Sequence, residues 1–200
     1  MIVNWPERVW VNSRVRRYVQ RREAAFFKKW RDLPAGAHCL EIGCGCGVGA
    51  RIIWEIFQPI AIDALDIDPA MLLLARRKRK PAGFDCLRLL AGDAQQLPYR
   101  SESFDAVFNY GIVHHLEDWQ SGIREVSRVL KKGGGFYFEE IYPPLYANPL
   151  FRRLLLHPTE NRFHGPEFRD LLAQSGLDLL PDYKESRFGI LGIAIKPQDL

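Results

Sequence analysis

The sequence of 200 residues lacks a long hydrophobic run. Its longest apolar stretch, from Phe188 to Ile195, is far shorter than the roughly 20 residues that a membrane-spanning helix needs. The first residues include Asn4, Pro6, Glu7 and several arginines, where a secretory signal needs a continuous apolar segment. We therefore expect a soluble chain with no transmembrane segment and a cytoplasmic location.

Cysteine is also scarce, with four residues and no C-x-x-C pair. Cys44 and Cys46 lie two positions apart in a glycine-rich segment, whereas Cys39 and Cys86 lie in apolar, strand-like runs. A zinc or iron–sulfur site needs a second ligand cluster at matching spacing, which the sequence does not have. The pattern predicts buried free thiols and no metal site.

Charge is unevenly distributed along the chain. The net charge is +4, but residues 1–31 hold nine Lys or Arg and only two Glu, so that this segment carries +7 and the remainder −3. Such a basic segment suits an anionic substrate, a nucleic acid or a membrane surface. A solvated helix face is the simpler explanation of these charges.

Helix-like and strand-like segments alternate along most of the chain. The N-terminal segment has apolar residues at helical spacing, with Asn4 as the predicted N-cap and Pro6 in the first turn. These residues are Val11, Val15, Tyr18, Val19, Phe26 and Trp30. Strands are predicted at 38–42, 60–65, 86–90, 104–108, 136–140, 177–180 and 188–195, and helices at 49–57, 69–80, 119–130 (closed by the glycines at 133–135) and 166–175. This order predicts an α/β fold, with a doubly wound, mainly parallel seven-stranded sheet and an N-terminal helix.

Glycines and acidic residues follow the predicted strands, and open parallel sheets bind ligands at these strand ends. The glycines after the first strand, from Gly43 to Gly47, permit positive φ and let a ligand approach the backbone. Asp66, after the second strand, can accept both hydroxyls of a ribose. Asp93 and the N–H of Ala94, after the third strand, can read the amine and a ring nitrogen of adenine.

Part of this pattern also fits a nicotinamide dinucleotide site. Gly45, Gly47 and Ala50 satisfy G-x-G-x-x-A, and Asp66 follows about 20 residues later. These residues alone therefore leave two nucleotide classes open.

The complete order of motifs resembles the class I S-adenosylmethionine-dependent methyltransferases, in particular the small methyltransferase-domain enzymes of type 11. The resemblance runs from about Cys39 to Glu140, and a nicotinamide enzyme is not expected to have its later motifs. Its most specific parts are Leu40-Glu41-Ile42-Gly43-Cys44-Gly45-Cys46-Gly47, Ala64-Leu65-Asp66-Ile67, Gly92-Asp93-Ala94 with Leu97-Pro98, Phe104-Asp105-Ala106-Val107, His114-His115-Leu116 and Arg128-Val129-Leu130-Lys131-Lys132-Gly133-Gly134.

The resemblance implies S-adenosylmethionine as the cofactor and a position for each of its parts. The implied contacts are Glu41, Gly43, Cys44, Gly45 and Gly47 for the methionine part, with the backbone of Asn109 and Tyr110 near its amino group, Asp66 for the ribose, Ile67 and Met71 beside the adenine, Asp93 at the adenine amine and Ala94 at the ring. We expect a single domain over residues 1–200. It comprises a helical arm (1–35), a cofactor-binding core (36–141), a substrate-side insertion (142–165) and a C-terminal helix with strands (166–200).

The acceptor is less constrained, because displacement at a sulfonium methyl group mainly requires alignment and exclusion of water. His114 and His115 are candidates for a base, since imidazole titrates near neutral pH; no catalytic residue is assigned. We expect a small-molecule substrate and no particular oligomeric state. The basic arm keeps RNA, protein or a lipid-like acceptor open as an alternative, and a non-catalytic cofactor-binding scaffold is a further one.

Overall fold

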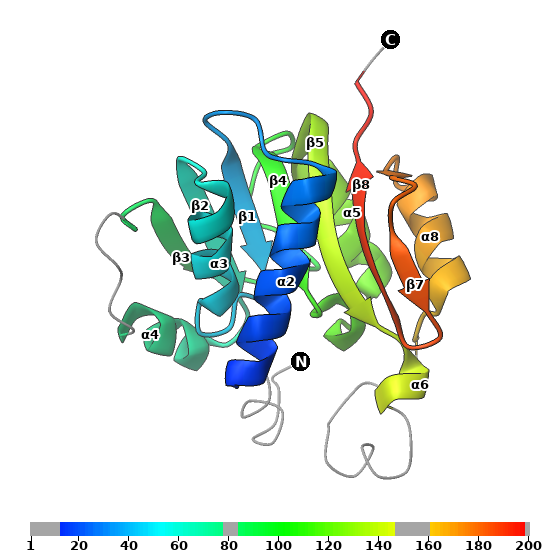
Figure 1. Cartoon of the computed structure of the whole chain (residues 1–200), viewed down its shortest axis with the longest axis horizontal. Helices are drawn as coiled ribbons and strands as arrows, with labels where there is room; N and C mark the ends of the chain where they lie inside the picture. Colours follow the sequence, from blue (N-terminus) through cyan, green and yellow to red (C-terminus); the bar gives the residue numbers. More distant parts are fainter. Residues whose placement is uncertain (1–12, 78–83, 147–160, 199–200) are drawn as a thin grey trace.

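The computed structural model describes residues 13–77, 84–146 and 161–198. Strands and helices alternate through most of this chain (Figure 1). The elements are α2 (Arg14–Trp30), β1 (His38–Ile42), α3 (Val48–Phe57), β2 (Ala61–Asp66), α4 (Pro69–Arg77), β3 (Leu87–Ala91), β4 (Phe104–Tyr110), the 3-10 helix η1 (Val113–His115), α5 (Trp119–Val129), β5 (Leu130–Ile141), α6 (Pro143–Tyr146), α8 (Gly165–Gln174), β6 (Asp178–Leu179), β7 (Lys184–Ser186) and β8 (Gly189–Ile195).

The strands form one mixed sheet in the order β3-β2-β1-β4-β5-β8-β6, with β7 paired to β8. Strands β1 to β5 run parallel, and β8 runs antiparallel to β5, β6 and β7. The chain moves outward from β1 to β3 and then returns to β4, so a topological switch point lies between β1 and β4. The predicted fold class is confirmed. The sheet has eight strands, one more than predicted. The additional strand is β7, which is short and exposed and has no apolar pattern.

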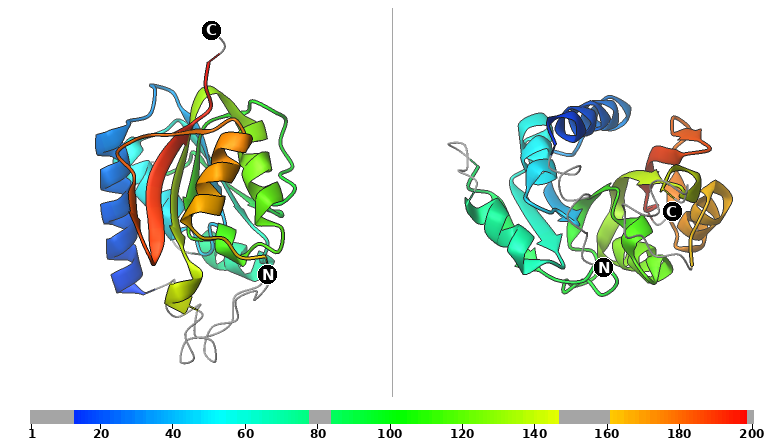
Figure 2. Two further views of the ribbon diagram at one scale, coloured as in Figure 1. Left: turned by 90° about the vertical axis from the view of Figure 1, so that its right-hand side faces the viewer. Right: turned by 90° about the horizontal axis from the view of Figure 1, so that it is seen from below.

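Helices cover both faces of the sheet (Figure 2). On one face, α2 and α3 bury Phe27 and Ile53 against the sheet. On the other face, α5 and α8 bury Val126 and Phe168. Side chains of a strand alternate between these two cores, as strand geometry requires, so the sheet is apolar on both sides. None of the helices in the described ranges combines the length and apolar character needed to cross a bilayer.

Helix α2 is present as predicted, but only part of its predicted apolar face is buried. Its N-cap is Ser13, whose hydroxyl accepts a hydrogen bond from the Arg16 N–H at 3.0 Å; Asn4 and Pro6 lie outside the described residues. Val15, Tyr18 and Val19 are exposed, whereas Phe26 and Trp30 are half-buried and Val11 lies outside the described residues. The buried residues are Arg16, Gln20, Glu23, Ala24 and Phe27. Ala24 and Phe27 pack on the sheet, and the helical period carries the same face back to polar side chains.

Two further expectations need correction. The glycines at 133–135 do not close helix α5; they lie inside β5, where Gly133 donates to the Lys196 carbonyl at 2.7 Å and Lys196 donates to the Gly134 carbonyl at 3.0 Å. Cys86 is half-buried, whereas Cys39, Cys44 and Cys46 are buried as predicted, and the four form no disulfide. Most of the predicted insertion, and residues 78–80 of the predicted fourth helix, lie outside the described ranges.

Candidate functional site

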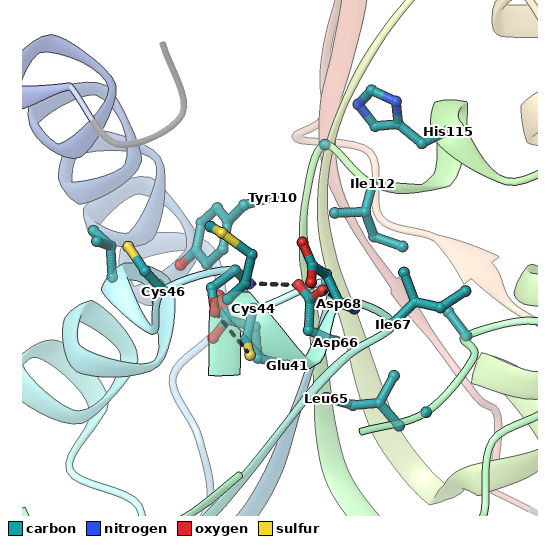
Figure 3. Close-up of a pocket in the computed structure, with 18 of the residues that line it drawn as sticks. Glu41, Cys44, Cys46, Leu65, Asp66, Ile67, Asp68, Tyr110, Ile112 and His115 are labelled. Carbon is teal, nitrogen blue, oxygen red and sulfur yellow. Dashed lines mark hydrogen bonds between the residues drawn. The ribbon is translucent and has the colours of Figure 1, made fainter. Parts of the chain in front are cut away.

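A cavity opens at the carboxyl ends of β1, β2, β3 and β4, beside the switch point (Figure 3). Ten of the twelve predicted contact residues line it: Glu41, Gly43, Cys44, Gly45, Asp66, Ile67, Met71, Asp93, Ala94 and Tyr110. Asn109 does not line the cavity, and its buried side chain instead donates to Glu140 Oε1 at 2.6 Å. Gly47 lines a neighbouring cleft instead. The residues predicted from separate strand ends are therefore brought together, although their individual roles stay predictions.

The glycines after β1 have different local functions. Gly43, Gly45 and Gly47 all have positive φ, at 67°, 51° and 79°. A Cβ at Gly43 would lie 2.1 Å from the Ile112 side chain, so Gly43 permits close packing of the chain on itself. At Gly45 the nearest atom to such a Cβ is the terminal methyl of Met71, at 3.6 Å. Gly45 therefore presents bare backbone to the cavity.

Asp66 joins the end of β2 to this glycine turn. Its Oδ2 accepts from the Gly45 N–H at 2.7 Å (Figure 3), and its Oδ1 accepts from the Asp68 N–H at 2.8 Å. Burial raises the pKa of Asp66, and these two backbone donors oppose the shift. Each carboxylate oxygen has a second lone pair, so Asp66 can still accept a ligand hydroxyl. Asp68 accepts from the Ala70 N–H at 2.9 Å, as a helix N-cap does.

Asp93 is held at the end of β3 in a similar way. Its Oδ1 accepts from the Gln95 N–H at 2.8 Å, which closes a local turn next to the cavity. Met71 is buried, whereas Ile67 is 45% exposed. A flat ligand between Ile67 and Met71 would therefore contact the fixed carboxylate of Asp93 and the partly solvated side chain of Ile67.

Three buried polar atoms at the cavity have no hydrogen-bond partner among the described residues: Glu41 Oε2, Tyr110 OH and Gln20 Oε1. Glu41 is only 2% exposed, and burial raises its pKa well above the ordinary value. Buried polar atoms in folded proteins are nearly always paired. Glu41 Oε2 and Gln20 Oε1 therefore offer acceptors to a ligand that donates hydrogen bonds, and the Tyr110 hydroxyl can donate or accept.

Helix α2 closes the same cavity through Arg16. Its Nη1 contacts both carboxylate oxygens of Glu23, at 3.1 and 3.2 Å, and its Nη2 contacts Glu139 Oε2 at 2.7 Å. Nη2 also donates to the Tyr110 carbonyl at 3.2 Å. Burial, followed by the charge of Glu139, raises the pKa of Glu23 to about 7. Helix α2 is thus fixed to the ends of β4 and β5 by a buried ionic cluster.

Arg16 and Gln20 are the two cavity residues from α2, and neither was predicted from the sequence. A signal for them exists in the helical spacing. Gln20 precedes Ala24 by four positions and Arg16 precedes Gln20 by four, so both lie on the stripe that contains the buried Ala24. Because both side chains are polar, the apolar pattern of the helix does not include them.

The two histidines after β4 have different surroundings. His115 lines the cavity, whereas His114 Nδ1 lies 2.7 Å from Glu140 Oε2 in the interior. Glu140 is fully buried and also accepts from Asn109 Nδ2 at 2.6 Å and from the Val113 N–H at 2.7 Å. Burial raises the pKa of Glu140 to about 8. His114 therefore belongs to the network that shapes the loop, and His115 is the histidine placed to meet a ligand.

Known methyltransferases resemble this chain in sequence. The methyltransferase-domain family model matches residues 40–138. A fatty-acid O-methyltransferase of Mycolicibacterium smegmatis is 36% identical over 145 residues, which cover 72% of this chain and 45% of that protein. A phthiotriol/phenolphthiotriol dimycocerosates methyltransferase of Mycobacterium tuberculosis is 34% identical over 108 residues, or 54% of this chain and 39% of that protein. The chain spans less than half the length of these relatives.

Solved structures resemble the fold over nearly the whole chain. The YcgJ protein of Bacillus subtilis superposes with a TM-score of 0.74 at 18% identity, covering 89% of this chain and 99% of that one. A SAM-dependent methyltransferase of Mesorhizobium loti gives a TM-score of 0.70 at 18% identity, covering 86% and 96%. At these identities the likeness concerns the fold.

Proposed function

We propose that this chain, which belongs to the class I S-adenosylmethionine-dependent methyltransferase family, is an O-methyltransferase. Its acceptor would be an oxygen atom of a small, lipid-like molecule. The observation that carries the cofactor assignment is the unpartnered, buried Glu41 Oε2 at the glycine turn. An acidic side chain in that position matches the family's Glu-x-Gly-x-Gly motif. It also supplies the acceptor that a ligand ammonium group requires.

The remaining cavity residues fit the other parts of the cofactor. Asp66 would hold the ribose hydroxyls, and Asp93 with Ala94 would contact the adenine, between Ile67 and Met71. Gly45 leaves room for the methionine part to lie on the backbone. S-adenosylmethionine, when bound, supplies an electrophilic methyl group on a sulfonium sulfur. The protein's own contribution is to orient this group and to exclude water from it.

Beyond Tyr110, the cavity wall is formed by Ile112, His115 and Leu116. Two of these side chains are aliphatic, which suits an acceptor with an apolar body. A carboxylate acceptor needs no base, whereas a hydroxyl acceptor must lose a proton, which His115 can accept. The relatives named for fatty-acid and dimycocerosate methylation support a lipid-like acceptor over RNA or protein.

The test has two stages. Thermal unfolding with S-adenosylmethionine, S-adenosylhomocysteine and NAD in parallel identifies the cofactor, because a ligand of the native state raises the melting temperature. We expect a rise with the two sulfur nucleotides that is lost in Asp66→Ala. Transfer of labelled methyl groups to fatty acids, long-chain alcohols, amines and RNA then identifies the acceptor. A rise with NAD alone overturns the cofactor proposal, and transfer to RNA alone overturns the acceptor proposal.

A further inference from the structure

A second cleft lies on the other side of the glycine turn, where α2, α3 and α4 meet residues next to β3. Its volume is 340 Å³, which falls within the range of roughly 300–1,000 Å³ typical of ligand sites. Its apolar lining comes from Ile52, Ala75, Phe84 and Leu87. Arginines stand around this lining: Arg14, Arg17, Arg21 and Arg51. The cleft therefore combines an apolar floor with a cationic rim.

The rim carries more positive charge than its acidic partner balances. Glu55, which also lines the cleft, pairs with Arg51 at 2.8 Å and with Arg21. Within the parts of the chain that are described, Arg14 and Arg17 form no ion pair with a carboxylate. Four guanidinium groups around one carboxylate create a positive potential that favours an anion in the cleft.

Exposed apolar side chains lie on two of the helices that contribute to the cleft. On α2, Val15 and Tyr18 are 59% and 62% exposed, next to the arginines at positions 14 and 17. On α4, Leu73 and Leu74 are 54% and 45% exposed, and two arginines follow at the end of the helix. The first turns of α2 and the whole of α4 lie at the same edge of the molecule (Figure 1).

Aliphatic side chains next to arginines are typical of segments that lie in the interface of an anionic bilayer. A single-stranded nucleic acid would instead require several aromatic side chains on which its bases stack. Tyr18 is the aromatic residue among the exposed large hydrophobic side chains of α2 and α4. The composition of this surface therefore favours lipid over RNA.

We propose that the cleft and its flanking helices bind the surface of an anionic lipid membrane. A headgroup phosphate would lie between Arg14 and Arg17, and the exposed side chains of α2 and α4 would enter the interface. The cleft borders the cavity assigned to the cofactor at Cys46 and Val48, whereas Arg14 and Arg17 line the cleft alone. The proposal does not depend on the methyl acceptor.

The experiment is co-sedimentation of the full chain with vesicles of pure phosphatidylcholine and of phosphatidylcholine mixed with phosphatidylserine, at low and at physiological salt. We expect binding only to the mixed vesicles, weakened by salt. The test variant Arg14→Glu/Arg17→Glu should lower this binding at least about tenfold, since each basic residue near an anionic surface contributes about 1 kcal/mol. The matched control, Lys29→Glu/Arg100→Glu, reverses the same charge at two exposed positions away from the cleft.

A second variant tests the apolar part. Val15→Ser/Val19→Ser changes exposed residues, so the fold is retained, and it should weaken vesicle binding without changing the salt dependence. Circular dichroism and S-adenosylhomocysteine affinity establish that each variant is folded. Absence of binding to the mixed vesicles at low salt overturns the proposal. Equal losses in the test and control variants, or RNA binding that the Arg14→Glu/Arg17→Glu variant abolishes in place of vesicle binding, also overturn it.

Discussion

Arg16 Nη2 lies 2.7 Å from Glu139 Oε2 and so joins the first described helix to the end of β5, 123 positions away in the sequence. The same guanidinium group also holds Glu23, and all three side chains are largely buried. Two buried carboxylates that share one cation are stable in these positions only while that cation is present. The position of α2 over the cavity therefore depends on Arg16.

Replacing Arg16 by methionine should destabilise the protein by about 3–5 kcal/mol, because it leaves two buried carboxylates facing each other. Urea unfolding measures this change. Arg17→Met is the matched control on the exposed side of the same helix and should change the free energy of unfolding by less than about 0.5 kcal/mol. Arg16→Met/Glu139→Gln should recover part of the loss, because it removes one of the two facing charges. Similar losses in the two single variants would show that Arg16 does not hold α2 in place.

Glu23 should make stability depend on pH. Burial and the charge of Glu139 raise its pKa to about 7, so the folded state holds a proton that the unfolded state releases at lower pH. The stabilisation is complete below the unfolded pKa of about 4.5 and is lost as the pH rises through about 7. The free energy of unfolding should therefore change less between pH 5 and pH 8 for Glu23→Gln than for the wild type. Glu140 has a pKa raised to about 8 and contributes in the same direction, so some slope should remain in that variant. Identical slopes in both proteins would contradict the raised pKa of Glu23.

Glu41 should couple cofactor binding to proton release. Burial raises its pKa well above the ordinary value, and a ligand ammonium group would favour the ionised carboxylate, so affinity should rise with pH. Calorimetric titration with S-adenosylhomocysteine in two buffers of different ionisation enthalpy measures the released proton. Glu41→Gln should abolish this release and weaken binding by about 2–3 kcal/mol. Glu117→Gln, at an exposed position, is the control. Unchanged proton release in Glu41→Gln would assign the proton to another group.

The elements that the sequence predicts well are those whose pattern is local. Strand β1 runs from His38 to Ile42 as predicted, because a short apolar run between a proline turn and a glycine turn has few alternatives. The strand ends that carry Asp66 and Asp93 follow from the same alternation. A parallel sheet then brings these residues to one edge without further information.

The features that could not be predicted from the sequence depend on contacts with residues far away in the chain. The burial of Arg16 requires Glu139 and the Tyr110 carbonyl, and no local pattern contains them. The glycines at 133–135 join β5 because Gly133 and Gly134 pair with Lys196. Gly43 lines the cavity, and its missing side chain also accommodates Ile112, which the sequence does not indicate. Such roles are set by tertiary contacts, which override local preference.

Gly49 provides a test of how closely the glycine turn and the acidic residue fit. Alanine usually stabilises a helix relative to glycine by about 0.5–1 kcal/mol. Here a Cβ would lie 1.8 Å from Glu41 Oε1 and 3.0 Å from Tyr110 Cδ2, so Gly49→Ala must displace the Glu41 carboxylate. We expect Gly49→Ala to lower both the free energy of unfolding and the affinity for S-adenosylhomocysteine.

The double variant separates this steric effect from an effect of helix propensity. In a Glu41→Ala background the carboxylate is absent, so adding Gly49→Ala should cost much less stability than it does in the wild type. Urea unfolding of the wild type, the two single variants and the double variant gives the coupling energy between positions 41 and 49. A coupling energy near zero would mean that the two side chains do not compete for the same space. A large one would mean that the glycine at position 49 is required because Glu41 occupies the volume that its side chain would fill.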